Sequence, residues 1–198
     1  MKVLPESSTY YLEDNAFVIS RLAFNKDDRS PIYAHMHRAY EIFMLIEGYA
    51  TYTVEGNLYD LCPMDIIITN MRELHAPIYQ SCFYKRINMI IKPRFLSPFI
   101  SPDFSPFSFF DLRKPGFCNK FDHTVVTGQG IAGLIEKIEK VLSENAPESG
   151  AMAKVYLMEL LFKMSKFSAL ADRTSTLSND AAHILEYINN NIAEDLSY

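Results

Sequence analysis

The stretch HMHRAYEIFMLIEG, residues 35–48, places three side chains that can bind a metal directly before an apolar run that ends at a glycine. Residues two apart on an extended chain point to the same side, so His35 and His37 would share one face of a strand. Glu41 and Phe43 have the same parity if the extension continues. The pattern predicts a buried strand whose inward face carries two imidazoles and a carboxylate.

The residues around this stretch, from 10 to about 95, are a series of short β-prone runs with turn signals between them. Gly56-Asn57 is one such signal, and it separates two runs that can pair as a hairpin. Short strands at this spacing predict an antiparallel sandwich or barrel. The runs are AFVISRLAF, EIFMLI, YATYTV, DIIIT and FYKRINMII.

Residues 93–122 hold five prolines and eight phenylalanines. Proline removes the donors of a β-ladder, which excludes a regular strand, whereas so many phenylalanines require burial. Two interpretations remain: an irregular segment packed on the domain, or an aromatic lid formed by residues 95–110. Core packing is the favoured one, because aromatic side chains are usually buried.

From Gly128 onward the apolar residues recur at helical spacing. The first helix should end at the breaker NAPESG, and a second should run from about Ala151 to Leu170. This second helix is apolar on most sides, so it needs two packing partners, the sheet and either its own chain or a second subunit. A third apolar stripe, residues 181–192, follows a polar linker. The first helix has an apolar face of Ile131, Leu134, Ile135, Ile138, Val141 and Leu142, with Glu136, Lys137, Glu139 and Lys140 on its other sides.

Composition excludes several classes of function. The net charge of −5 and the lack of long cationic stretches argue against nucleic-acid binding by these residues alone, because phosphate contacts need clustered Lys and Arg. The three cysteines lie far apart and predict no disulfide framework, which suits a reducing cytoplasm. No signal-peptide core and no apolar run of about 20 residues is present, so we expect a cytoplasmic protein without membrane contact.

His75 is a fourth candidate ligand, ten residues after Asp65 and on a neighbouring pair of strands. Three imidazoles and one carboxylate suit a divalent first-row metal, because neutral imidazole ligates directly and the carboxylate offsets part of the metal charge. Unpaired inside a barrel, these groups would be costly to desolvate. The same residues also fit the polar lining of a water-filled or ligand-filled pocket, and the spacing leaves both interpretations open.

The stretch 35–48 resembles the first cupin motif, in which HxH is followed by a glutamate and then a glycine. The stretch NMRELH, residues 70–75, has the spacing of the second cupin motif, PxGxxH, with Asn70 and Arg72 in place of the proline and the glycine. The resemblance implies a mainly β fold, a cupin-type antiparallel β-barrel or jelly roll followed by C-terminal α-helices. It also implies a divalent metal (Zn, Ni, Mn or Fe) held by His35, His37, Glu41 and His75.

The order of these parts resembles an AraC-family transcriptional regulator. The stretch ILEYINNNIAEDLS, residues 184–197, is similar to the opening of the helix-turn-helix DNA-binding domain of that family. The resemblance implies a cupin-like sensor domain with an N-terminal arm at 1–125 and a helical dimerisation region at 126–172. Residues 173–198 would then be a linker and the first helix of a truncated helix-turn-helix domain.

On this resemblance the chain is no enzyme but the sensor and dimerisation portion of a regulator. A small-molecule effector, such as a sugar, would bind inside the barrel and control transcription. Its contacts would be His35, His37, Glu41, Phe43 and His75.

Three further expectations follow from the resemblance. The helices at 130–170 would form a homodimer, and DNA would be contacted only through a domain beyond Tyr198. Residues before about Asn15 would cover the pocket, with Tyr10 and Tyr11 as a lid. The alternative is a metal-dependent small cupin enzyme, a dioxygenase or an isomerase, that uses the same metal ligands.

Overall fold

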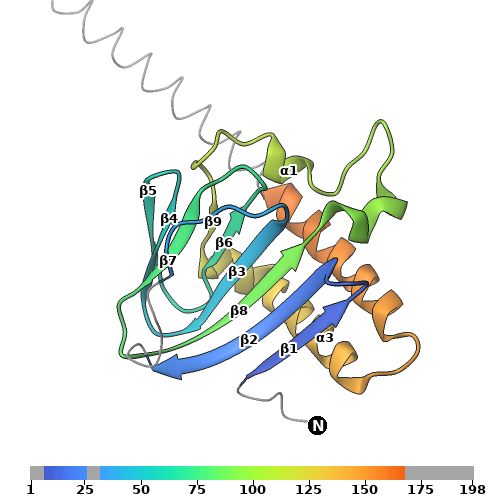
Figure 1. The fold of residues 1–198 in the computed structure, drawn as a ribbon, viewed down its shortest axis with the longest axis horizontal. Coiled ribbons are helices and arrows are strands. Elements are labelled where there is room, and N and C mark those ends of the chain that lie inside the picture. The colour runs from blue at the N-terminus through green and yellow to red at the C-terminus, as the bar shows by residue number, and fades with distance from the viewer. Residues whose placement is uncertain (1–6, 26–31, 168–198) are drawn as a thin grey trace, which may run out of the picture.

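The computed structural model describes residues 7–25 and 32–167. In these residues the chain forms three layers, a small β-sheet, a large β-sheet and a layer of helices (Figure 1). The expected helix over 181–192 and the rest of region 173–198 lie outside the described residues. No helix of the described part is long and apolar enough to cross a membrane.

Both sheets are antiparallel, as predicted. The strands are β1 (Ser8–Leu12), β2 (Phe17–Asn25), β3 (Tyr40–Glu47), β4 (Ala50–Val54), β5 (Asn57–Leu61), β6 (Ile66–Thr69), β7 (His75–Tyr79), β8 (Phe83–Ile91) and β9 (Lys120–Phe121). The large sheet has the order β1-β2-β8-β3-β6-β9, and the small sheet has the order β5-β4-β7. The two sheets share one apolar cluster, to which β3, β6 and β8 contribute from one side and β4 and β5 from the other.

The centre of the large sheet, β3 and β6, is buried on both faces. Successive side chains of a strand point to opposite sides, so each of these strands contacts both neighbouring layers. On β3, Phe43 and Leu45 belong to the inner cluster between the sheets. Ile42 and Met44 belong to the outer cluster, which contains the helices. Residues 42–46 are a continuous apolar run for this reason, and Phe43 faces inward as its parity predicts.

The outer face of the large sheet is covered by α2 (His123–Gly128), α3 (Ile131–Glu144) and a helix over 149–167 (Figure 1). The apolar face predicted for α3 is confirmed, and α3 ends in the predicted breaker at Asn145, where φ is 51°. Glu139, which the sequence placed outside this apolar face, is nevertheless buried. Its side chain is 1% exposed and accepts two hydrogen bonds from Arg21 of β2, at 3.0 Å from Nε and 2.5 Å from Nη2.

The phenylalanine-rich segment packs on the outer cluster. It contains only short helices, the 3-10 helix η2 (Pro93–Phe99) and α1 (Ser108–Asp111). Phe95 stacks on Phe17 with ring centroids 5.0 Å apart, and Phe107 stacks on Tyr40 at 4.1 Å. None of residues 93–122 lines the cavity between the two sheets. The favoured interpretation, core packing rather than a lid, is therefore confirmed.

Two glycine positions fix tight turns. The β4–β5 hairpin turns at Glu55 and Gly56, whose φ values are 50° and 79°, so the turn lies one residue earlier than predicted and Asn57 begins β5. Gly48 has a φ of 93°, and a Cβ added there would lie 2.8 Å from the carbonyl oxygen of Phe83. The glycine that closes the 35–48 stretch is thus required by close backbone packing.

Candidate metal and ligand site

Four polar side chains converge at the rim of the inner cluster. The candidate ligand atoms of His35, His37, Glu41 and His75 all lie within 4.8 Å of one another. Glu41 comes from β3 and His75 begins β7, while His35 and His37 come from the segment before β3. The chain bends at residues 38 and 39, so the single continuous strand expected from His35 onward is wrong. His35 is instead fixed by two backbone hydrogen bonds to His75, both 3.0 Å long.

Each imidazole is oriented by a main-chain carbonyl near its Nδ1. The pairs are His35 with Tyr33 at 2.9 Å, His37 with Ala39 at 3.2 Å and His75 with Glu73 at 2.8 Å. A carbonyl oxygen can only accept, so Nδ1 carries the proton and donates it. Nε2 of each neutral ring then has its lone pair available, which is the arrangement in which histidines bind metals.

Glu41 is the centre of the cluster. Its Oε2 lies 2.7 Å from Nε2 of His37 and 3.3 Å from Nε2 of His75, and its Oε1 accepts a hydrogen bond from the Tyr52 hydroxyl at 3.0 Å. Burial alone would raise the pKa of Glu41, but the contacts with His37 and His75 outweigh it and hold the pKa below its ordinary value. The carboxylate is therefore ionised, as a metal ligand must be.

The contacts of His37 and His75 show how a cation fits this site. His37 faces an oxygen at both ring nitrogens, so a second proton or a cation at Nε2 is needed to satisfy the ring. His75 is 0% exposed, and its Nε2 lies 3.3 Å from Oε2 of Glu41 but forms no hydrogen bond among the described residues. Burial lowers the pKa of His75, but the neighbouring Glu41 carboxylate outweighs burial and raises the pKa overall. A buried nitrogen without a partner costs stability, and a divalent ion would supply that partner.

The loop before β7 is fixed by a buried ion pair that the sequence did not reveal. Glu73 is 0% exposed and accepts hydrogen bonds from both terminal nitrogens of Arg113, at 3.3 and 3.0 Å. The backbone N–H groups of Asn70 and Gly116 also donate to this carboxylate, at 2.8 and 2.9 Å. Because the Glu73 carbonyl holds Nδ1 of His75, this network positions one of the candidate ligands.

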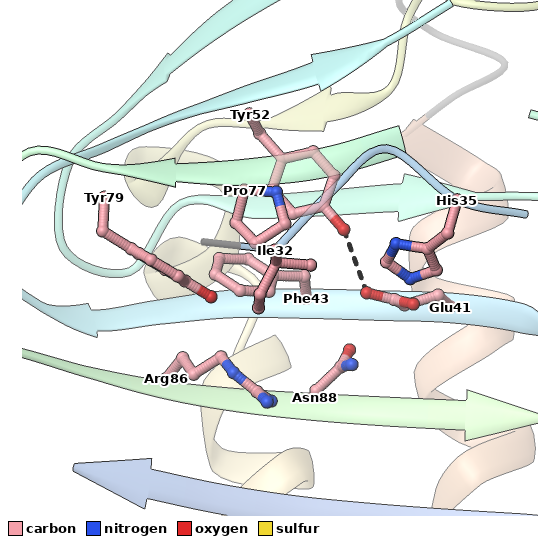
Figure 2. A pocket seen from close by; sticks show the side chains of 9 residues that line it. All are labelled: Ile32, His35, Glu41, Phe43, Tyr52, Pro77, Tyr79, Arg86 and Asn88. Carbon is pink, nitrogen blue, oxygen red and sulfur yellow. Dashed lines mark hydrogen bonds between the residues drawn. The ribbon is translucent and has the colours of Figure 1, made fainter. Parts of the chain in front are cut away.

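A cavity of about 190 Å³ lies beside the cluster, between the two sheets (Figure 2). It is lined by Ile32, His35, Glu41, Phe43, Tyr52, Pro77, Tyr79, Arg86 and Asn88. Figure 2 shows Arg86 and Asn88 pointing into it from β8, with Glu41 and His35 at one end. Of the residues predicted to contact an effector, His35, Glu41 and Phe43 line the cavity, whereas His37 and His75 belong to the cluster but not to the lining.

The sequence did not single out Arg86 and Asn88. A signal for them exists, because these polar residues alternate with Ile87 and Met89 in the run FYKRINMII. The isoleucine and the methionine belong to the outer cluster, so the polar pair points inward.

The expected lid of the N-terminal arm is wrong for residues 8–12. These residues form β1, which pairs with β2 at the edge of the large sheet. Tyr10 packs against the outer cluster and Tyr11 is exposed, and neither lines the cavity. Residues 1–6 lie outside the described residues.

Comparison with known proteins gives similarity at the level of solved structures. No protein-family model matches the chain. No curated protein matches it. A cupin-superfamily protein from Desulfitobacterium hafniense is 15% identical, with 46% of this chain and 83% of that chain covered and a TM-score of 0.37. A cupin protein from Bacteroides fragilis is 14% identical, with 46% and 82% covered and a TM-score of 0.37. KdgF from Halomonas sp. is 15% identical, with 46% and 83% covered and a TM-score of 0.36.

These similarities cover less than half of this chain and say nothing about its activity. The fold class follows from the structure itself: two antiparallel sheets around a shared interior, followed by helices, form the predicted cupin-type fold. None of the three descriptions names a transcription regulator, so the resemblance to the AraC family remains a prediction.

Proposed function

We propose that the chain is the effector-binding and dimerisation portion of an AraC-family DNA-binding transcriptional regulator. The observation that carries this proposal is that the cavity and the helices lie on opposite faces of one sheet. On β3, Glu41 lines the cavity while Ile42 contacts the outer cluster, and on β8 the same holds for Arg86 and Ile87. A ligand that shifts these strands therefore also shifts the neighbouring residues that contact the helices.

The helix over 149–167 is the proposed dimerisation element, within the region 130–170. Most of its apolar residues are buried against the sheet, but Val155 and Phe162 remain exposed. Phe162 stacks on Phe104 with ring centroids 5.5 Å apart, which extends the apolar surface. Exposed apolar patches of this kind are typical of interfaces between subunits.

The remaining parts of the proposal concern partners and location. DNA would be contacted through a domain beyond Tyr198 rather than by these residues, whose net charge is −5. A cytoplasmic location belongs to the same proposal. A divalent cation held by His35, His37, Glu41 and His75 would provide a Lewis acid that binds an oxygen atom of the effector.

A repression assay tests the regulator proposal. The chain is fused to a heterologous DNA-binding domain that represses a reporter only as a dimer. We expect the fusion to repress, and Phe162→Glu to abolish repression by placing a charge in the interface. Leu58→Glu changes an equally apolar, exposed residue of β5 and should leave repression unchanged. A fusion no more active than the DNA-binding domain alone, or a monomer at micromolar concentration in sedimentation, would refute the proposal.

The second candidate function is a metal-dependent cupin enzyme, a dioxygenase or an isomerase. It is favoured by one observation: His35 and Glu41 belong both to the metal-capable cluster and to the cavity lining. A bound substrate would therefore lie beside the metal ligands, as in sites that keep coordination positions open. Turnover of a small organic acid by Fe-, Mn-, Ni- or Zn-loaded protein, combined with an inactive fusion, would favour the enzyme.

A further inference from the structure

The cavity contains a cation that pairs with no carboxylate of the described residues. Arg86 lines it from β8, and its Nη1 donates a hydrogen bond to the hydroxyl of Ser20 at 3.3 Å. Among residues 7–25 and 32–167, no carboxylate oxygen lies within 4.0 Å of the Arg86 guanidinium. A guanidinium stays charged at any physiological pH, so its charge in this half-buried position is not removed by loss of a proton.

The one carboxylate in the cavity lining is already engaged. Oε2 of Glu41 lies 2.7 Å from Nε2 of His37, and Oε1 accepts a hydrogen bond from the Tyr52 hydroxyl, so both oxygens already have polar neighbours in the protein. Its negative charge is therefore shared with the imidazoles and with any metal that they hold. Arg86 lies on β8, across the cavity from Pro77 and Tyr79 (Figure 2). A fork of N–H donors in such a place suits a carboxylate, which it can bind with two parallel hydrogen bonds.

An unpartnered acceptor lies on the same strand face as this fork. Asn88 is two residues from Arg86 on β8, so both side chains point to the same side of the sheet. Its Oδ1 is buried and has no hydrogen-bond partner among the described residues. An amide oxygen accepts from a hydroxyl group, and a buried one without a donor costs stability. The two residues together therefore present a carboxylate-binding fork beside a hydroxyl-binding acceptor.

We propose that the effector of this cavity is a small hydroxycarboxylate anion, whose carboxylate pairs with Arg86 and whose hydroxyl group donates to Asn88. This inference rests on the proposed effector role of the same cavity and names the chemical class of the effector. A neutral sugar, which the sequence suggested, would add no negative charge to Arg86, which has no carboxylate partner among residues 7–25 and 32–167. A divalent cation on the histidine cluster would add positive charge and strengthen the preference for an anion.

The cavity is small for a ligand site, at about 190 Å³. Ligand pockets for larger molecules usually measure about 300 to 1,000 Å³. A three- or four-carbon acid such as lactate or malate suits a cavity of this size.

Calorimetric titration of the purified 198-residue protein tests the inference with matched ligands. Lactate and malate are compared with lactamide, which lacks the charge, and with propionate, which lacks the hydroxyl group. We expect one of the two acids to bind, lactamide to bind about tenfold more weakly or worse, and propionate to bind several-fold more weakly. Equal affinity for lactate and lactamide would overturn the inference, as would the absence of binding by both acids at millimolar concentration.

Two variants locate the effect. Arg86→Gln should abolish the preference for lactate over lactamide, and Arg72→Gln, which removes a 73% exposed arginine outside the cavity, should retain it. Arg86→Gln with wild-type affinity for the acids would also refute the inference. If Arg86→Gln does not fold, the comparison of the four ligands on the wild-type protein still decides the matter. The repression assay needs no added ligand, so failure of the regulator proposal and failure of this inference give different results.

Discussion

Replacing Glu73 with alanine is expected to lower the free energy of unfolding by about 3–5 kcal/mol. The carboxylate is 0% exposed, and its removal leaves the buried guanidinium of Arg113 without its ionic partner. Three other donors lose their acceptor at the same time, the backbone N–H groups of Asn70 and Gly116 and the side-chain amide of Asn119. Their loss moves the expected effect toward the upper end of the range, because each unsatisfied buried donor costs about 1–3 kcal/mol.

Urea denaturation followed by circular dichroism measures this effect. The matched control is Glu47→Ala, which removes an exposed carboxylate 3.3 Å from Lys85 and should cost less than about 1 kcal/mol. The double variant Glu73→Ala/Arg113→Met should recover part of the loss, because no unpaired charge remains buried. A loss for Glu73→Ala no larger than that of the control would show that the network does not stabilise the fold as argued.

The Glu73→Ala substitution should also weaken metal binding at the candidate site. The Glu73 carbonyl holds Nδ1 of His75, although the Glu73 side chain contacts none of the four candidate ligands. Once the loop loses its ionic anchor, we expect the affinity for a divalent ion to fall by about tenfold or more. Titration with Zn²⁺ or Ni²⁺ under conditions where the variant is folded gives this number, and unchanged affinity would contradict the positioning role.

Three further predictions concern the site, the core and the pH dependence of stability. His37→Ala should abolish stoichiometric metal binding and the rise in the thermal midpoint of unfolding on adding metal. The control His123→Ala, which lies outside the cluster, should leave both unchanged. A His37→Ala protein that retains one metal ion per chain would refute the ligand set. Phe110→Ala should lower the free energy of unfolding, measured by urea denaturation, by about 3–5 kcal/mol, because this ring is fully buried in the outer cluster. The lactate affinity of the folded variant should stay unchanged. A loss of affinity without a loss of stability would favour a lid instead. Burial raises the pKa of Glu139 above its ordinary value of 4.5, so the folded state holds this proton more tightly and the wild-type protein loses stability as pH rises above about 4.5. The stability of Glu139→Gln relative to wild type should therefore increase as the pH rises above about 4.5, and a difference that is constant with pH would contradict this.

Local periodicity in the sequence predicted the parts of the fold that depend on neighbouring residues. The alternation in β3 placed Phe43 on the inner face, and the helical spacing placed Ile135 in the core. Burial of Glu139 was missed because its partner, Arg21, is 118 residues away in the chain. Without a partner in view, a glutamate on a helix is expected to face solvent.

The candidate site was predicted in part for similar reasons. The four metal-capable residues form a recognisable spacing, and the structure brings them together. The bend at residues 38 and 39 was missed because no glycine or proline marks it. The alternation of Arg86 and Asn88 with apolar residues was visible, but a period of two does not say which face of the sheet borders a cavity.

The alternation along β8 has a consequence for how this protein can change under selection. Arg86 and Asn88 border the cavity, while Ile87 and Met89 support the helices. Mutations at the even positions therefore alter ligand specificity with little effect on the helix layer, and mutations at the odd positions alter the helix layer with little effect on specificity. One or two substitutions can therefore change which ligand the cavity binds during evolution, while the packing of the helices on the sheet is kept.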